Sequence, residues 1–311
     1  GNNVNNTIAA SDLKNIGNAT TGTVTVDNAV KITGSQADVT AALVTTDSLV
    51  EVTDVVVNIT DLAFNGNNVN NTIAASDLKN IGNATTGTVT VDNAVKITGS
   101  QADVTDALVT TDSKVEVGAA LVDVTGASIS QYDDIASATT GDVTYTLSDT
   151  AANITSAAAS KINNATTLTV TSGGGANDLN LENATTANLT AITATGDTNI
   201  DNVKLSAAVT SSNIATIDFV EDTAADVLIL NTADSSNWTT FTSDGSIAGG
   251  SSTFTFNKFN NFDVASGEDK LGIFYGGSNA TGAFQEITGT TPTSSYRLRD
   301  GVVYEDSFNS D

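Results

Sequence analysis

The sequence predicts a mainly β fold with short helices: a parallel β/α solenoid repeat array, followed by a β-rich C-terminal module. The first observation is a duplication, in which Gly1–Val52 recurs as Gly66–Val117 with two changes. Ala41 becomes Asp106, and Leu49 becomes Lys114. The second is a shorter phrase ending in Thr-Thr, which returns about every 20 to 30 residues, the length of one strand-plus-helix turn. A single longer step indicates one extra coil around residues 55–59.

Short stretches of alternating apolar and polar residues follow the Thr-Thr phrase and are the third observation. Thr23–Val26 places valines on one face and threonines on the other, and Val143–Leu147 and Leu168–Thr171 repeat this pattern. Strict alternation is typical of a strand with one buried face, and Val and Thr are favourable strand residues. Each stretch is therefore predicted to be a half-buried strand.

Helix signals lie between the predicted strands. Ser35 followed by Asp38 resembles a capping box, with Asp in place of the usual Glu. Ser11 is expected to open a short helix, and Asp149 to cap a helix over Thr150–Ile162. The Asn before Ala-Thr-Thr suits a helix end, because Asn tolerates the left-handed conformation. Each helix carries only a narrow apolar stripe, so stacking on neighbours is needed to bury it.

The composition and the repeat pattern of the sequence change after residue 216. The Thr-Thr phrase disappears and aromatic residues become common. Near the end, Ser295–Arg299 and Val302–Glu305 flank Asp300-Gly301, a dipeptide typical of a tight hairpin turn. The predicted domains are therefore a solenoid array over 1–216 and a β-rich module over 217–311.

Composition excludes several classes of function. The 311 residues include 36 acidic and 11 basic ones, giving a net charge of −25, and neither His nor Cys occurs. A phosphate backbone would be repelled by this charge, so we expect no nucleic-acid partner. Catalysis by His or Cys and the usual zinc sites are excluded. Carboxylate-based catalysis such as glycoside hydrolysis stays chemically possible, but the basic residues are scattered and substrate-clamping aromatics are missing from the array, so we expect no enzymatic activity. No run of about 20 apolar residues is present, so no insertion into a membrane is expected.

The segments Ser252–Phe256 and Phe262–Leu271 resemble a stretch found near the end of many large bacterial secreted proteins. In that group, a DTFVF…DFxxGxDKIDL stretch follows calcium-binding nonapeptide repeats, as in surface-layer and RTX-like proteins exported by type I secretion. The phrases Leu147–Ile154 and Ile32–Val39 are also similar to repeats of this group. The resemblance implies an extracellular location at a bacterial cell surface and calcium as a bound ion.

Two candidate calcium sites follow from this resemblance. Gly173–Leu181 (GGGANDLNL) is similar to the nonapeptide GGxGxDxUx, so Asn177 and Asp178 would be ligands. It departs from the motif at Ala176 and Asn180, and a flexible glycine-rich turn is the alternative. Glu268 and Asp269 form an acidic pair in the second segment, for which a solvated turn is the alternative. Paired carboxylates are suitable ligands for a hard cation such as Ca²⁺.

The sequence therefore predicts an extracellular structural protein that self-assembles into a bacterial surface layer or filament, with calcium bound between carboxylates. Its principal partner would be a second copy of the chain. The alternative is a calcium-stiffened cell-surface adhesin, in which the array is a stalk and a cell-surface polysaccharide is the binding partner.

Overall fold

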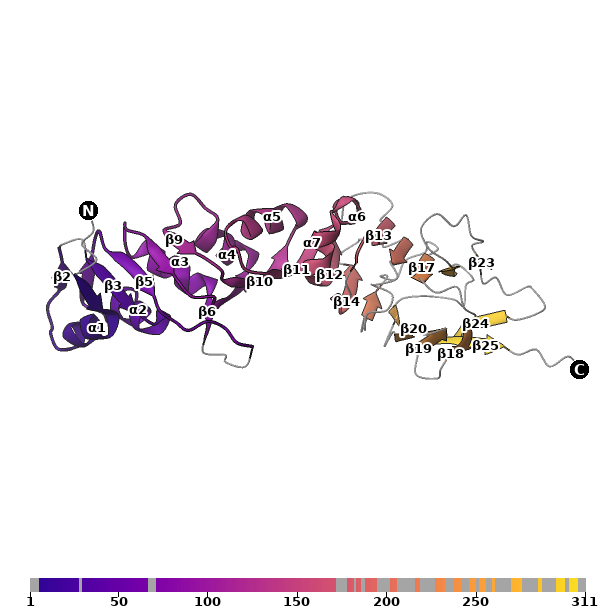
Figure 1. Cartoon of the computed structure of the whole chain (residues 1–311), viewed down its shortest axis with the longest axis horizontal. Helices are drawn as coiled ribbons and strands as arrows, with labels where there is room; N and C mark the ends of the chain where they lie inside the picture. The colour runs from indigo at the N-terminus through magenta and orange to yellow at the C-terminus, as the bar shows by residue number, and fades with distance from the viewer. Residues whose placement is uncertain are drawn as a thin grey trace, which may run out of the picture. The chain divides into compact units, whose positions relative to one another are not determined.

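The computed structural model describes residues 6–27, 30–66, 71–171, 178–181, 183–185 and 188–194, together with the backbone of separate strands between residues 202 and 306 (Figure 1). The architecture is mixed α/β, with parallel sheets and alternating strand–helix units. Two compact units, Gly1–Tyr145 and Thr146–Asp311, are described separately. The division predicted after residue 216 stays a prediction.

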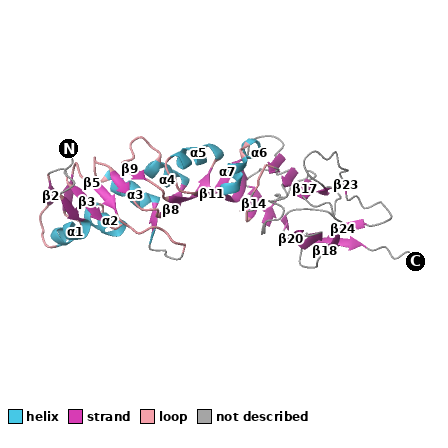
Figure 2. Cartoon of the chain, viewed as in Figure 1, coloured by secondary structure: helices cyan, strands magenta, loops and turns pink. Residues whose placement is uncertain are grey.

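The first unit contains both copies of the duplicated sequence, and strands and helices alternate along it (Figure 2). The first repeat copy, residues 1–52, and the segment after it form β1 Thr7–Ala9, α1 Ala10–Asn18, β2 Val24–Val26, β3 Lys31–Gly34, α2 Gln36–Leu43, β4 Val50–Val52 and β5 Val56–Ile59. The second repeat copy, residues 66–117, and the segment after it form β6 Thr72–Ala74, α3 Ala75–Asn83, β7 Val89–Val91, β8 Lys96–Ser100, α4 Gln101–Leu108, β9 Val115–Val117, β10 Leu121–Ala127 and α5 Ile129–Ser137.

Equivalent strands pair in parallel and in the same register in both copies. Thr7 lies opposite Lys31 in the pair β1–β3, and Thr72 lies opposite Lys96 in the pair β6–β8. The pairs β2–β4 and β7–β9 also match, with valine opposite valine at both ends of each pair. Identical sequence therefore produces identical strand pairing twice.

Strand β5 joins the two copies. It pairs in parallel with β3 of the first copy and with β7 of the second, where Val57 lies between Ile32 and Val89. The longer sequence step predicts an extra coil near residues 55–59; a strand, β5, is present there, and the complete coil stays a prediction. The resulting sheet has the order β1-β3-β5-β7-β9.

The core is built from the predicted alternation. Val89 and Val91 are 0% and 2% exposed, whereas Thr90 between them remains partly exposed. Val143 and Tyr145 are buried on either side of the exposed Thr144, and the Tyr145 ring lies 4.7 Å from that of Tyr132. The predicted half-buried strands are thus confirmed.

Helix starts follow the predicted caps in part. The Ser35 hydroxyl accepts the Asp38 N–H at the start of α2, as predicted. Helix α1 begins at Ala10 without a side-chain cap, so the start predicted at Ser11 is wrong; strand β1 leads directly into the helix, and Asp12 lies in its first turn. Helix α1 ends at Asn18, so the helix end predicted at this Asn is confirmed, but Asn18 is still helical and Ala19 after it has φ −88°, so the left-handed conformation predicted there is wrong.

In the second unit, the single helix predicted over Thr150–Ile162 is wrong. Two short helices are present, α6 Ala151–Ser156 and α7 Ala159–Asn164, because Ala157 and Ala158 have extended backbone and break the run. The Thr150 hydroxyl caps α6 by accepting the Asn153 N–H, while the Asp149 carboxylate accepts the Thr150 N–H at 2.8 Å. Each helix still buries one isoleucine of the predicted stripe.

The remaining strands of this unit pair in both directions. Parallel ladders connect β12 with β14 and β16, and β13 with β15, β17 and β22. Antiparallel pairs include β24–β25, where Arg299 lies opposite Val302, so the predicted hairpin pairing is confirmed. The strands are β11 Val143–Thr150, which spans the division between the units, β12 Ala165–Thr171, β13 Asp178–Leu181, β14 Ala191–Ala194, β15 Asn202–Leu205, β16 Thr216–Asp218, β17 Val227–Thr232, β18 Trp238–Phe241, β19 Ser246–Gly249, β20 Ser252–Thr255, β21 Phe259–Asn260, β22 Lys270–Tyr275, β23 Gln285–Glu286, β24 Ser295–Arg299 and β25 Val302–Asp306.

We expect Val89→Asp to destabilise the chain by about 3–5 kcal/mol, because it places an unpaired charge in a fully buried position. Val24 occupies the same place in the first copy but is only half-buried, so Val24→Asp should cost much less. Urea denaturation of the two variants measures the difference. Equal losses of stability would contradict the burial seen at β7.

Candidate functional site

The main polar feature of the first unit is a set of hydrogen bonds at the junction between repeats. At the β5–β7 junction, the segment Ala84-Thr-Thr-Gly87 forms hydrogen bonds with the residues that precede β5. The buried Thr85 hydroxyl donates to the Val55 carbonyl at 2.7 Å and accepts the Gly87 N–H at 3.0 Å. Thr86 donates both its N–H and its hydroxyl to the Thr53 carbonyl, each at 2.9 Å. Two threonines thereby satisfy two main-chain carbonyls of the preceding segment.

The same clasp is built again beside β10. The Thr139 hydroxyl donates to the Ala120 carbonyl at 2.6 Å and accepts the Gly141 N–H at 3.0 Å. Thr140 donates its N–H and hydroxyl to the Gly118 carbonyl at 2.9 and 3.1 Å. We call this arrangement the Thr-Thr-Gly clasp. Because its acceptors are main-chain oxygens, it holds segments of different sequence, residues 53–57 in one case and 118–122 in the other.

The glycine of the clasp permits a very close approach of the two backbones. A Cβ atom added at Gly87 would lie 2.2 Å from the Val55 carbonyl oxygen, and one added at Gly141 would lie 2.2 Å from that of Ala120. Real Cβ atoms do not approach an oxygen so closely, so a side chain here would force the strands apart. The glycine is therefore required by the contact across the junction.

Further polar contacts cross the junction between the two copies. The side-chain amide of Gln36 donates to the Asp77 carboxylate at 3.1 Å, and Asn93 donates to the Asp61 carbonyl at 2.8 Å. The Asp61 carboxylate in turn accepts the Gln36 N–H at 2.6 Å, at the start of α2. Helices α2 and α3 pack together here, and Ile81 of α3 is fully buried.

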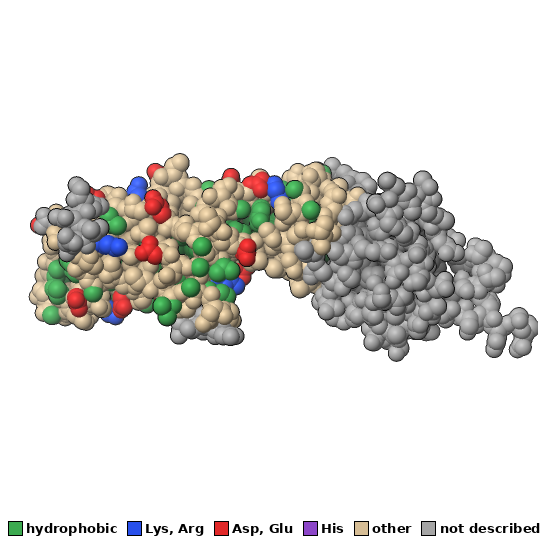
Figure 3. Space-filling view, in the orientation of Figure 1, with side chains coloured by type: hydrophobic (Ala, Val, Ile, Leu, Met, Phe, Trp, Pro, Cys, Tyr) green, Lys and Arg blue, Asp and Glu red, His purple; other side chains and the backbone are tan. Residues whose placement is uncertain are grey.

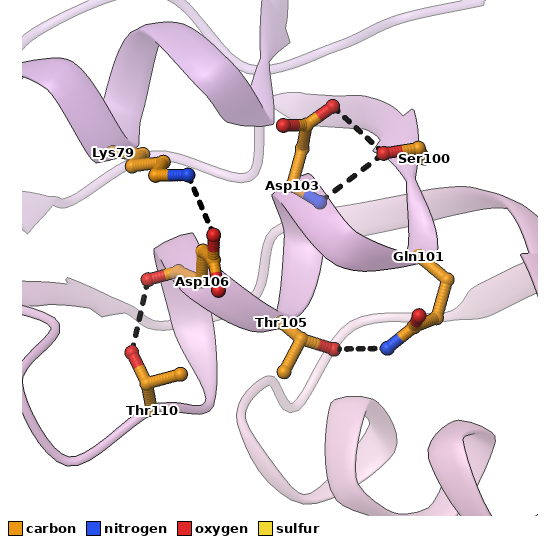
Figure 4. Close-up of polar contacts among 7 residues, drawn as sticks. All are labelled: Lys79, Ser100, Gln101, Asp103, Thr105, Asp106 and Thr110. Atoms are coloured by element: carbon orange, nitrogen blue, oxygen red, sulfur yellow. Dashed lines mark hydrogen bonds and ion pairs between the residues drawn. The ribbon is translucent and has the colours of Figure 1, made fainter.

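A small pocket of about 130 Å³ marks the second copy, and both positions at which the copies differ line it. Asp106 accepts a hydrogen bond from the Lys79 ammonium at 2.5 Å, joining α4 to α3 (Figure 4). In the first copy the residues at these places are Ala41 and Lys14, so the ion pair is specific to the second copy. The lining residues are Lys79, Gly82, Asn83, Asp106, Thr110, Asp112, Ser113, Lys114 and Val115.

The electrostatics of the pocket suit a structural contact better than chemistry. Two lysines face two aspartates, so the lining is close to neutral overall. The hydrogen bond and negative charge of Asp106 raise the pKa of Lys79, which keeps the ammonium protonated and unsuited to act as a base. Both side chains of the pair are more than a third exposed, so solvent screens their attraction.

The predicted calcium ligands fall largely outside the described residues. Asn177, Glu268 and Asp269 lie outside them, and Asp178 opens strand β13 with a side chain that is not described. Within the described part of the chain, no group of three or more acidic residues could hold a metal ion. No helix described is both long and apolar enough to cross a bilayer.

Comparison with known proteins gives no relative: no protein-family model, no curated protein and no solved structure matches the chain. The function is therefore inferred from the chain's own geometry. The sequence predicts a helix end at the Asn before Ala-Thr-Thr, but the hydrogen bonds that the two threonines make across the junction were not predicted. The available signal was the glycine that follows the two threonines at residues 22, 87 and 141.

We expect Thr85→Val to cost about 1–3 kcal/mol, because it leaves the buried Val55 carbonyl without its hydrogen bond. Thr20→Val is the matched control: the same residue of the first copy is exposed, so its replacement should change stability by less than about 0.5 kcal/mol. Urea denaturation of both variants provides the measurement. A silent Thr85→Val variant would argue against the clasp.

We expect Asp106→Ala to lower the pKa of Lys79 towards its ordinary value of 10.5. A raised pKa in the folded state stabilises below the unfolded value and loses this contribution as pH rises through the folded value. The difference in unfolding free energy between wild type and variant should thus be constant from about pH 6 to 9, and it should disappear as the pH rises above 10.5. NMR titration of Lys79 and unfolding at each pH provide the test. A gap that persists at the highest pH would rule out the ion pair as its cause.

Proposed function

We propose that this chain is an extracellular structural repeat protein that self-assembles into a bacterial surface layer or filament, with no catalytic role. Its strand–helix units would stack as a parallel β/α solenoid over residues 1–216, followed by a β-rich C-terminal module. The observation that carries the proposal is the Thr-Thr-Gly clasp, which joins successive units in the same way at two junctions.

The energetics of a single unit support stacking. Each unit of the first copy has strands of three or four residues and helices of eight or nine, which bury too little apolar surface to fold alone. Residues such as Ile32, Ile59 and Ile97 become fully buried only because a neighbouring strand covers each one. A protein built in this way gains stability by adding neighbours, and contact between molecules extends the same principle.

Calcium is proposed as the ion that allows acidic copies to approach one another. The net charge of −25 makes close contact between copies unfavourable, and a divalent cation held between carboxylates offsets this repulsion. On the face shown in Figure 3, the acidic side chains of the described residues are dispersed rather than gathered. We therefore propose that calcium bridges carboxylates of different molecules, with the residues around Asp178 and Glu268 as further candidates.

We expect EDTA to disperse ordered assemblies of the purified chain, or to lower its melting temperature, and added Ca²⁺ to reverse the change. Negative-stain images with and without calcium show the assemblies, and NaCl at matched ionic strength controls for screening. If EDTA alters neither assemblies nor melting, calcium has no place in the proposal. Monomers that bind a cell-surface polysaccharide and never assemble would favour the adhesin stalk instead.

A further inference from the structure

The segment between β5 and β6 contains the single Asn-Gly dipeptide of the chain, Asn65-Gly66. Both residues are exposed and belong to neither a helix nor a strand. Gly66 has φ +81°, and a Cβ atom added there would meet nothing within 4 Å. A positive φ is readily adopted by glycine but costs other residues free energy, so this backbone conformation depends on glycine.

Asn65 and Gly66 carry the two groups needed for an intramolecular reaction. The main-chain nitrogen of the residue after an asparagine can attack the side-chain carbonyl carbon Cγ and close a five-membered ring. Glycine favours this attack, because it has no Cβ to obstruct the approach and its backbone rotates freely. The Gly66 N–H donates to no acceptor among the described residues, so its nitrogen is not held in a hydrogen bond.

The exposed asparagines at the ends of α1 and α3 lack this combination. Asn18 and Asn83 are each followed by an alanine, and the N–H of that alanine is engaged. The Ala19 N–H donates to the Ile16 carbonyl and the Ala84 N–H donates to the Ile81 carbonyl, each at 3.1 Å. Exposure is therefore shared by these asparagines, whereas an unengaged glycine nitrogen is specific to Asn65 among them.

We propose that Asn65 is a site of spontaneous modification, at which the folded chain converts its own asparagine to aspartate and isoaspartate. The Gly66 nitrogen forms a bond to Asn65 Cγ, the bond from Cγ to the side-chain nitrogen breaks, and ammonia leaves with the proton from Gly66. Water then opens the cyclic imide. Opening at Cγ gives aspartate, and opening at the main-chain carbonyl carbon gives isoaspartate, in which the main chain runs through the former side chain.

The reaction changes the connection between the two repeat copies without removing the contacts that hold them together. Either product adds one negative charge, and isoaspartate also lengthens the main chain by one methylene. On either side of the site, the Phe64 N–H donates to the Ala94 carbonyl at 2.8 Å, and the Asn71 side-chain amide donates to the Ala63 carbonyl at 2.9 Å. We therefore expect the fold to tolerate the change. The reaction requires neither calcium nor assembly.

The test incubates the native full chain at mildly alkaline pH and follows each asparagine by peptide mapping with mass spectrometry. We expect replacement of the amide by an acid at Asn65, at a rate close to that in a synthetic peptide of residues 62–69, while Asn83 stays intact. The rate should rise with pH, since hydroxide removes the proton from the Gly66 nitrogen. Methylation by a protein isoaspartyl methyltransferase identifies the isoaspartate product.

Two variants separate the chemistry from mere exposure of the loop. We expect Gly66→Ala to slow the reaction about ten-fold or more, because the added Cβ hinders the attack and disfavours the positive φ. Asn65→Gln keeps an exposed amide but would have to close a six-membered ring, so it should stay unmodified with an unchanged melting temperature. A native chain in which Asn65 stays intact while the peptide reacts would overturn the site, as would equal modification of Asn65 and Asn83.

Discussion

Two buried main-chain carbonyls, those of Val55 and Ala120, impose the constraint on which the repeat junctions depend. A carbonyl removed from water must be hydrogen-bonded, or it costs about 1–3 kcal/mol. At each junction a threonine hydroxyl supplies the bond, and the glycine two residues later lets the backbones approach closely enough for it to form. The strand pairing of β5 with β7 and the burial of the valines beside it both follow from this approach.

Recognition through the main chain explains how one clasp serves different neighbours. The segment that leads into β5, residues 53–57, reads Thr-Asp-Val-Val-Val, and the segment that leads into β10, residues 118–122, reads Gly-Ala-Ala-Leu-Val, yet both present carbonyls to an equivalent pair of threonines. Only the apolar pattern, which buries Val55 in one case and Ala120 in the other, has to be retained. The two positions at which the copies differ, Asp106 and Lys114, take no part in the clasp bonds and line the small pocket of the second copy instead.

The sequence was sufficient to predict the features that depend on interactions between residues close together in the chain. The strand alternation around Val89 and the cap at Ser35 involve neighbours in sequence, and both predictions are confirmed. The break between α6 and α7 could not be predicted, because an apolar stripe with i, i+4 spacing favours one helix, and Ala157 has no residue-specific signal to end it. The clasp was missed for a related reason: Thr85 bonds a residue thirty positions earlier in the chain, a pairing that no local pattern reveals.

The clasp also shows how strongly acidic repeats can be joined. Its hydrogen bonds use hydroxyls and main-chain groups, and its buried contacts are valine and isoleucine, so its strength depends little on the charge of either partner. The ion pairs found in the described residues, Lys79–Asp106 and Lys96–Asp123, instead join neighbouring elements of the second copy and of the segment after it. Repulsion from a net charge of −25 acts over about a Debye length of 10 Å or less in salt, whereas a clasp acts at contact. Cohesion through the uncharged clasp and the negative charge of the chain are therefore separable features of this protein.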